Sequence, residues 1–460
     1  DTLQYHAHVS ALASSGNRAP FLLRANQHGN IAQTPCSSNF SAAIFKRPTC
    51  PTRWWDYDFG VQLTGQTNTD PKRNSGDNLI YPTTMITGYF EQLYAHTRLY
   101  IVDLTAGIKP MVHGSQARQL SMGGLLFSGN AHPIPRITIG IDEYIPFPGL
   151  FGYLEIKGGL THGWLWEQDT YVTTNNIFVD NVKLHHKFIG LRVGGRLPVT
   201  LAYEMHHAAQ WGGYKNPLLT GERTIDYGNR LKDFWNVFLF RSGGISQSDQ
   251  LNAQGNHIGF QEIALTYKQD SWLVRAYWQS LFEDMSAAFI GFGMNVADGL
   301  WGINIQQSQW PYINELTYEF LNTTSQSGPM HDKDGLVFAG RDTYYHNSAY
   351  PHGWSYFGSI IGNPYIQVNN SRVRAHFVGL GGDIYGYNYR LMASHVNNYG
   401  TYQQPRYSTS TALMLEVSKY IEKAWGLEFS VALAGDIGTQ YGNQFGAMLT
   451  VRKRGLITQW

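Results

Sequence analysis

The amino-acid sequence predicts an all-β protein, a transmembrane antiparallel β-barrel of about 18 strands with plug segments made of loops and short helices. The first observation is alternation over residues 411–452, where Leu427, Phe429 and Val431 alternate with small or polar residues. The second is composition, because only 15% of the residues are charged, while Gly, Tyr and Trp number 49, 29 and 13. Amphipathic aromatic residues at this density are typical of the girdles at a membrane interface. The third is that no apolar run approaches the ~18 residues that a spanning helix needs, so strands are expected to cross the membrane.

Strands are expected wherever apolar and polar residues alternate with a period of two. In the N-terminal half, this pattern predicts strands over 3–13, 55–64, 89–98, 99–107, 136–142, 154–157, 182–187 and 199–206. In the C-terminal half it predicts strands over 262–267, 272–279, 315–320, 371–385 and 387–399, a weaker one within 292–306, and the closing hairpins of 411–452. The pattern gives about seventeen or eighteen strands, and single-chain bacterial barrels have even numbers.

The chain is expected to form a single domain, residues 1–460, because no linker divides it. A barrel can reach this length as one domain, since its size grows with the number of strands. Long loops or plug elements are expected over 27–53, 110–133, 212–256 and 322–370, with a short helix within 231–240. A β-propeller or a set of β-sandwiches fits less well, because the sequence shows neither a blade repeat nor domain linkers.

Charge and cysteine content bear on partners and compartment. The net charge of +1 argues against nucleic acid as a partner, because no basic stripe is available for phosphate binding. The chain begins at Asp1 without a signal-peptide pattern, which we interpret as a processed N-terminus. Cys36 and Cys50 lie close together in the sequence, and a disulfide between them is predicted; it would imply an oxidising compartment. Two free thiols are the alternative.

Several short stretches together resemble the Wzi family of capsule-assembly proteins, in the form found in Bacteroidota. They are spread over nearly the whole chain: PFLLRANQ at 20–27, YFEQLYA at 89–95, GGLTHGW at 158–164, AQWGG at 209–213, YYHN at 344–347, GWSY at 353–356, GNP at 362–364 and HFVGLGG at 376–382. The resemblance implies an integral barrel of the bacterial outer membrane, present there after signal-peptide cleavage. It also implies a lectin-like, non-enzymatic protein without a cofactor. Its partners would be capsular or other surface polysaccharide, outer-membrane lipid and other envelope proteins.

The stretch 344–365 is the candidate glycan-binding segment. Flat aromatic rings can stack on the C–H faces of sugars, while amide and imidazole groups can bond to hydroxyls. The candidate contacts are Tyr344, Tyr345, Asn347, His352, Trp354 and Tyr356. The alternative is that these aromatic side chains pack a plug or an aromatic belt.

Histidines and charged residues on the polar strand faces admit more than one interpretation. His6 and His8 are two residues apart and share one face of a strand, whereas the adjacent pairs 185/186 and 206/207 each point to opposite faces. No metal-ligand motif is present, so no metal site and no catalytic site are predicted. Charges of both signs on the inward faces predict either a hydrophilic lumen that grips or passes polar solutes, or ion pairs that seal it.

The function predicted from the sequence is a non-catalytic outer-membrane β-barrel that binds surface polysaccharide and supports capsule assembly and attachment. The alternative is a porin-like channel for saccharides or other polar solutes. A barrel enzyme acting on lipid or glycan is the least favoured, because no triad or pair of carboxylates with the required geometry is identifiable.

Overall fold

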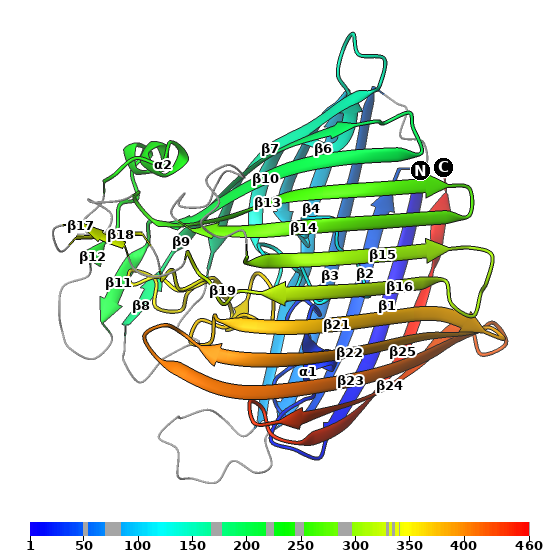
Figure 1. The fold of residues 1–460 in the computed structure, drawn as a ribbon. Coiled ribbons are helices and arrows are strands. Elements are labelled where there is room, and N and C mark those ends of the chain that lie inside the picture. Colours follow the sequence, from blue (N-terminus) through cyan, green and yellow to red (C-terminus); the bar gives the residue numbers. More distant parts are fainter. Residues whose placement is uncertain are drawn as a thin grey trace.

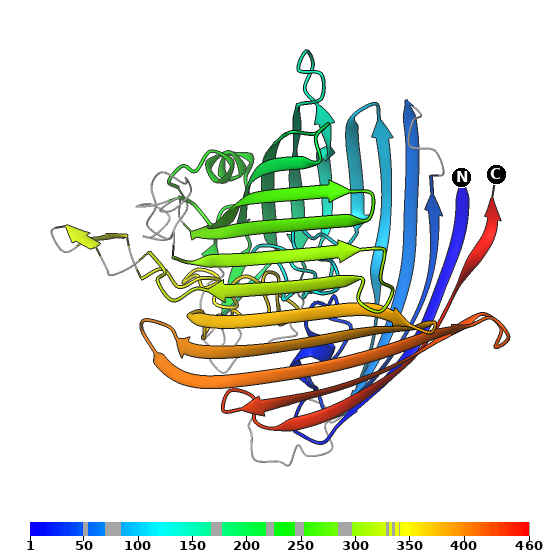
Figure 2. The ribbon, with the colours of Figure 1, turned by 45° about the vertical axis from the view of Figure 1, so that its right-hand side comes forward.

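In the computed structural model, 18 strands form one closed antiparallel sheet, which confirms the predicted barrel (Figure 1). The structure describes residues 1–48, 54–69, 84–166, 177–217, 225–243, 253–283, 297–327, 331–333, 336–339 and 341–459. The barrel closes because β1 (Thr2–Ser14) pairs with β2 (Cys36–Arg47) on one side and with β25 (Gln444–Gln459) on the other. The first and last strands therefore lie side by side, as Figure 2 shows.

The other barrel strands follow one another around the ring in chain order, each hydrogen-bonded to its neighbours. They are β3 (Trp55–Thr69), β4 (Thr84–Leu99), β5 (Val102–Ile108), β6 (Pro135–Pro146), β7 (Leu154–Leu165), β9 (Val182–Val193), β10 (Val199–Trp211), β13 (Asn256–Gln269), β14 (Trp272–Glu283), β15 (Gly299–Gln307), β16 (Glu315–Asn322), β21 (Val373–Ile384), β22 (Tyr387–Gly400), β23 (Pro405–Ile421) and β24 (Leu427–Gly438).

Small elements lie in the connections. They are the helices α1 (Phe21–Arg24) and α2 (Leu231–Phe238), the small sheet of β8 (Ile177–Asp180), β11 (Tyr214–Pro217) and β12 (Ile225–Asp226), and the pairs β17 (His331–Lys333) with β18 (Leu336–Ala339) and β19 (Ser355–Tyr356) with β20 (Ser359–Ile360). Neither helix in the described part of the chain is long and apolar enough to cross a membrane.

The alternation of side chains sorts the two faces of the wall as the sequence predicts. On β23, Leu413 is 54% exposed on the outer face, while its neighbours Ala412 and Met414 are buried on the inner face. The same pattern on β24 places Phe429 outside and Ser430 inside. A wall that is apolar outside and polar inside is that of a transmembrane barrel.

The two ends of the barrel differ. At one end the strands are joined by short turns, such as Tyr385–Gly386 between β21 and β22, where both residues have positive φ (53° and 77°) as a two-residue hairpin of type I′ requires. Both chain termini lie at this short-turn end (Figures 1 and 2). At the other end, called the long-loop end below, most of the connections are longer, and three of them fold into the barrel.

These three connections form the plug, defined as residues 15–35, 109–134 and 341–372. Helix α1 belongs to it and lies within the ring of strands (Figures 1 and 2). Buried apolar side chains of all three segments pack together and against the inner wall, among them Leu23, Leu125 and Ile366. The barrel therefore has a packed interior at the long-loop end, which agrees with the expectation of plug segments at 110–133 and 322–370.

The expectation of a loop over 27–53 is wrong, because Cys36–Arg47 forms the barrel strand β2. Its outward residues include Phe40 and Ile44, which are exposed, whereas Asn39 and Ser41 face the lumen. The Ser, Asn and Ala content of this stretch resembles loop composition. In a lumen-facing position, however, small polar residues are what the strand requires.

The described residues do not support the predicted disulfide between Cys36 and Cys50, of which Cys50 lies outside them. Cys36 is a free thiol within the described residues. Cys36 begins β2, whose 12 residues at about 3.4 Å each separate it from Arg47 by more than about 30 Å. The three residues that follow Arg47 can span only about 11 Å, whereas a disulfide needs Cα atoms within about 7 Å.

The short helix expected within 231–240 is confirmed as α2, which lies at the long-loop end outside the ring of strands (Figure 1). Its Val237 and Phe234 pack with Ala209 and Trp211 of β10. The helix and Phe240, which follows it, therefore cover outward-facing residues at the end of β10, including the buried His207.

Candidate functional site

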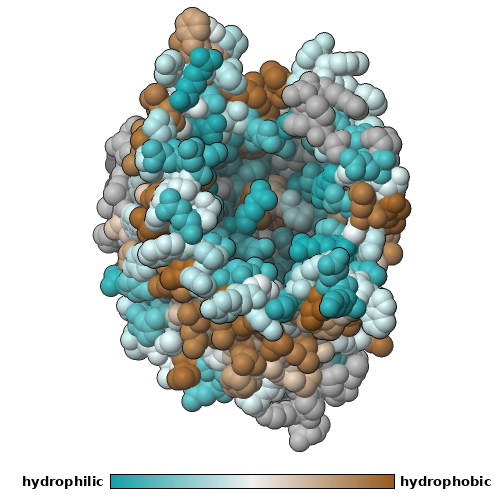
Figure 3. Space-filling model, turned by 90° about the vertical axis from the view of Figure 1, so that its right-hand side faces the viewer, coloured by the Kyte–Doolittle hydropathy of each residue, from teal (hydrophilic) through white to brown (hydrophobic). Residues whose placement is uncertain are grey.

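A polar cavity of about 870 Å³ occupies the lumen at the short-turn end. Figure 3 looks into this mouth and shows a hollow lined mainly by hydrophilic residues. Strands β1, β22, β23, β24 and β25 supply one wall, and the plug supplies the floor. The volume falls in the range of about 300–1,000 Å³ that is common for ligand sites. His6 and His8 of β1 both line this cavity, as expected from their shared strand face.

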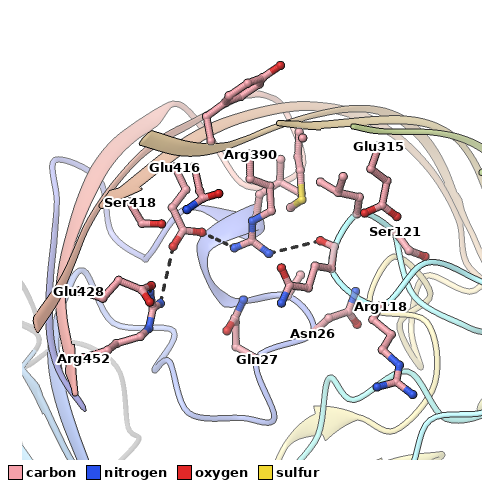
Figure 4. A pocket seen from close by; sticks show the side chains of 18 of the residues that line it. Asn26, Gln27, Arg118, Ser121, Glu315, Arg390, Glu416, Ser418, Glu428 and Arg452 are labelled. Carbon is pink, nitrogen blue, oxygen red and sulfur yellow. Dashed lines mark hydrogen bonds and ion pairs between the residues drawn. The ribbon is translucent and has the colours of Figure 1, made fainter. Parts of the chain in front are cut away.

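Charged side chains on four adjacent strands form a ladder across this wall (Figure 4). Arg390 of β22 pairs with Glu416 of β23, whose Oε1 also accepts a hydrogen bond of 2.7 Å from the Ser430 hydroxyl. Arg452 of β25 lies 3.6 Å from Glu416 and 3.1 Å from Glu428 of β24. Each group in the ladder thus has a partner, and the wall presents fixed donors and acceptors to the cavity.

The plug supplies further polar groups to the floor of the cavity. Asn26, Gln27, Arg118 and Ser121 line it (Figure 4). Arg118 is exposed to the cavity and makes no ion pair with any other residue of the described ranges. The lining contains five Arg or Lys residues and three Glu residues: Arg118, Arg390, Arg452, Lys453 and Arg454 against Glu315, Glu416 and Glu428. This cationic excess favours an anionic polar ligand.

Buried carboxylates on the wall hold the plug in place. Glu262 of β13 accepts hydrogen bonds from the backbone N–H (2.9 Å) and the hydroxyl (2.5 Å) of Ser115. Glu319 of β16 accepts from the Ser121 hydroxyl at 2.7 Å and from the Met122 N–H at 2.6 Å. Because a buried charge is costly unless its lone pairs are satisfied, these contacts fix the plug segment 109–134 against the wall.

The inward-facing charges predicted from the sequence take two roles in the structure, of which only ion pairing across the wall was among the alternatives considered. Some pair across the wall, such as Lys157 with Glu204 at 2.6 Å. Others, such as Glu262 and Glu319, bind the plug. The ladder on β22 to β25 faces an open cavity instead. Arg118, Arg390 and Arg452 are site residues that were not predicted from the sequence, although the alternation of 445–452 places Arg452 on the lumen face.

Four of the six predicted glycan contacts are buried within the plug. Tyr344, Tyr345 and Trp354 have no exposed surface, and Tyr356 is 4% exposed. The Tyr344 hydroxyl donates to Asp298 at 2.9 Å, and the Trp354 indole N–H donates to the carbonyl of Leu126 at 2.9 Å. These contacts agree with the packing alternative; recognition of a sugar by these rings stays a prediction that would need the segment to open.

The other two predicted contacts, Asn347 and His352, are half-buried near the long-loop end. The Asn347 side chain accepts from the backbone N–H of Ala349 at 2.8 Å and so stabilises a local turn. Burial lowers the pKa of His352 to about 4, so its imidazole is neutral near pH 7. The six predicted residues thus belong to the plug, at the end of the barrel opposite to the 870 Å³ cavity.

Comparison with known proteins shows similarity in fold. No family model matches the sequence, and no curated protein matches it. Among solved structures, the chain is similar to Wzi of Escherichia coli, a carbohydrate-binding β-barrel of the outer membrane involved in group 1 capsule assembly, with a TM-score of 0.60 at 14% identity over 97% of this chain and 84% of that one. OccAB2 of Acinetobacter baumannii gives a TM-score of 0.49 at 9% identity, covering 99% and 98% of the two chains. OccK7 of Pseudomonas aeruginosa gives 0.45 at 8% identity, covering 99% of each chain.

Proposed function

We propose that the chain is a non-catalytic barrel of the bacterial outer membrane that binds an acidic surface polysaccharide and supports capsule assembly. The proposal includes distant membership of the Wzi family, in the form found in Bacteroidota. The observation that carries it is the pairing of a plugged lumen with an open, cationic, polar cavity. A plugged barrel is suited to binding, whereas a channel needs a continuous path.

The positions of the short turns and the long loops indicate which side of the membrane the cavity faces. In barrels of this type the short turns face the periplasm and the longer loops face outward. The cavity would then engage polysaccharide from the periplasmic side, during assembly. Attachment at the outer surface would fall to the long-loop end, where the predicted contacts of 344–356 lie.

The first test is replacement of Arg118 by Gln. A charge-assisted hydrogen bond contributes roughly 1.5–3 kcal/mol, so affinity for a uronic-acid oligosaccharide is expected to fall about tenfold or more. Titration calorimetry of the purified barrel in detergent measures this change. Arg118 has no ion-pair partner in the described ranges. Its replacement therefore leaves no carboxylate unpaired, and the fold should be unaffected.

Arg241→Gln is the matched control, because Arg241 is exposed at the long-loop end, outside the cavity lining. Equal affinity of the Arg118 variant and the parent would contradict the cavity as the glycan site. If binding survives Arg118→Gln but is lost in Asn347→Ala or His352→Ala, the glycan site lies at the long-loop end instead.

The rival function is a porin-like channel, and one observation favours considering it. A second polar cavity of about 230 Å³ lies beyond α1 and is lined by Arg18 and Arg24, while Leu22 and Ala25 line the larger one. Movement of residues 20–27 would bring the two cavities together.

We expect the intact barrel to show no steady conductance in planar bilayers, because the plug is hydrogen-bonded to the wall at Glu262 and Glu319. Recordings over a range of voltages provide the measurement. Reproducible ohmic steps in the parent protein would favour the channel over the binding protein.

A further inference from the structure

Three histidines from separate parts of the chain meet inside the barrel at the plug. His113 belongs to the plug segment 109–134, His186 to β9 and His206 to β10. His186 and His206 are near neighbours on the inner face of adjacent strands, because His206 pairs in register with Phe188 and Ala208 pairs with His186. One ring nitrogen from each of the three histidines lies within 4.8 Å of the other two.

The ring geometry brings donor atoms together. His186 Nε2 lies 3.2 Å from His206 Nδ1. The planes of the two rings are nearly parallel, with centroids 5.4 Å apart and 11° between the planes. The ring of His113 lies 4.8 Å from each of the other two, so it completes a triangle.

The Glu204 carboxylate lies beside the His206 ring and can fix its orientation. Glu204 Oε2 lies 3.1 Å from His206 Nε2, on the side of the ring away from His186. When Nε2–H donates to Glu204, Nδ1 keeps its lone pair on the side of the ring that faces His186. A carboxylate behind a ligating histidine is the usual outer-shell arrangement at zinc sites, where it fixes the tautomer and raises the basicity of the ligand.

Buried side chains surround the triangle. His186 and His206 have no exposed surface. Phe127 and Phe188 pack against the His186 ring, and Phe260 stacks on the His206 ring at 4.6 Å. His186 Nδ1 is buried without a hydrogen-bond partner.

We propose that His113, His186 and His206 bind one Zn²⁺ ion, which joins the plug to the barrel wall. Imidazole nitrogens suit zinc, which binds histidine at about 2.0–2.1 Å. Tetrahedral geometry at that distance places the nitrogens about 3.3 Å apart, close to the 3.2 Å already present between His186 and His206. His113 has to approach by up to about 1.5 Å, the difference between 4.8 Å and the tetrahedral spacing, which a side chain on the plug loop can do by rotation.

The competing explanation is a hydrogen-bonded histidine pair that needs no metal, with His113 packed beside it. The two explanations differ in what they predict for zinc content and for each variant. In the metal explanation His113 is as important as His206, although His113 forms no hydrogen bond to either of the other rings in the described structure.

The test uses the full-length barrel, refolded in detergent with Zn²⁺ and then freed of unbound metal by gel filtration. Mass spectrometry is expected to find about one zinc per chain in the parent and in His395→Gln. His395 is the matched control, because it lies on the exposed outer face of β22 beside Thr411. His113→Gln and His206→Gln are expected to lose the zinc, and Glu204→Gln to bind it about 10–100-fold more weakly.

Heat-modifiable gel mobility reports whether each variant forms the barrel. If His206→Gln does not assemble, His113→Gln decides the question, because its residue lies in the plug and outside the wall. Zinc well below one per chain in the parent, or equal zinc in the parent and His113→Gln, would overturn the proposal and leave the hydrogen-bonded pair.

Discussion

Replacing Trp354 with Ala is expected to lower the free energy of unfolding of the plug by about 3–5 kcal/mol, the usual cost of removing a fully buried large aromatic side chain. Trp354 has no exposed surface, packs its ring 5.7 Å from that of Phe127, and donates to the carbonyl of Leu126. The variant loses these contacts between the plug segments 341–372 and 109–134. Because the strand ladder is untouched, the barrel itself should still assemble.

Urea unfolding followed by limited proteolysis of the plug measures the effect, with heat-modifiable mobility as the check on the barrel. Trp310→Ala is the matched control, because Trp310 is 70% exposed in a short-turn connection and its loss should cost little. If Trp354→Ala keeps the stability of the parent but loses glycan binding, the packing role is contradicted. Direct recognition by that ring would then be favoured.

Replacing Leu413 with Arg is expected to impair barrel assembly, at a cost of about 2–4 kcal/mol for a cation near the middle of the bilayer. Leu413 is 54% exposed on the outer face, midway along β23 between the outward Tyr407 and Lys419. The guanidinium group of the introduced arginine cannot reach water from that position without distorting the membrane or the strand. Folded yield in lipid vesicles, measured by heat-modifiable mobility, reports the cost.

The cost should depend on depth along the outer face. Phe429→Arg is expected to cost less than Leu413→Arg, because Phe429 pairs in register with Lys419, near the edge of the apolar band. Leu413→Phe is the control for a change of volume without charge. Equal assembly of Leu413→Arg and the parent would contradict the assigned lipid face of β23.

The barrel was predictable because its wall follows from a local rule. On β23 and β24 the two-residue period assigns Leu413 and Phe429 to lipid and Ser430 to the lumen, and no distant contact changes that assignment. The strand β2 escaped prediction because its lumen-facing residues, such as Asn39 and Ser41, also occur in loops. The expected environment of Cys36 depended on the same interpretation, since a residue treated as part of a loop lies at one end of an extended strand.

The candidate sites were less predictable, because many of their residues lie in the connections between strands. No local sequence pattern encodes the path of these connections inside the barrel. The tyrosines and the tryptophan of 344–356 have the composition of a sugar site and of a packed plug alike. Only their position beneath the loop of 109–134 separates the two interpretations. Arg118 carries no periodic signal at all, and its role in the cavity depends on the fold of the plug.

The sequence by itself determined the closed antiparallel wall, its lipid and lumen faces and the presence of plug segments, because side-chain alternation and interfacial aromatics act strand by strand. Tertiary structure alone decided which mouth is filled, where the 870 Å³ cavity opens, and that His113 meets His186 and His206. The physical reason is that a β-barrel wall is built from neighbouring strands. The interior is built from loops that reach across the lumen to partners tens or hundreds of residues away, such as Glu319 with Ser121.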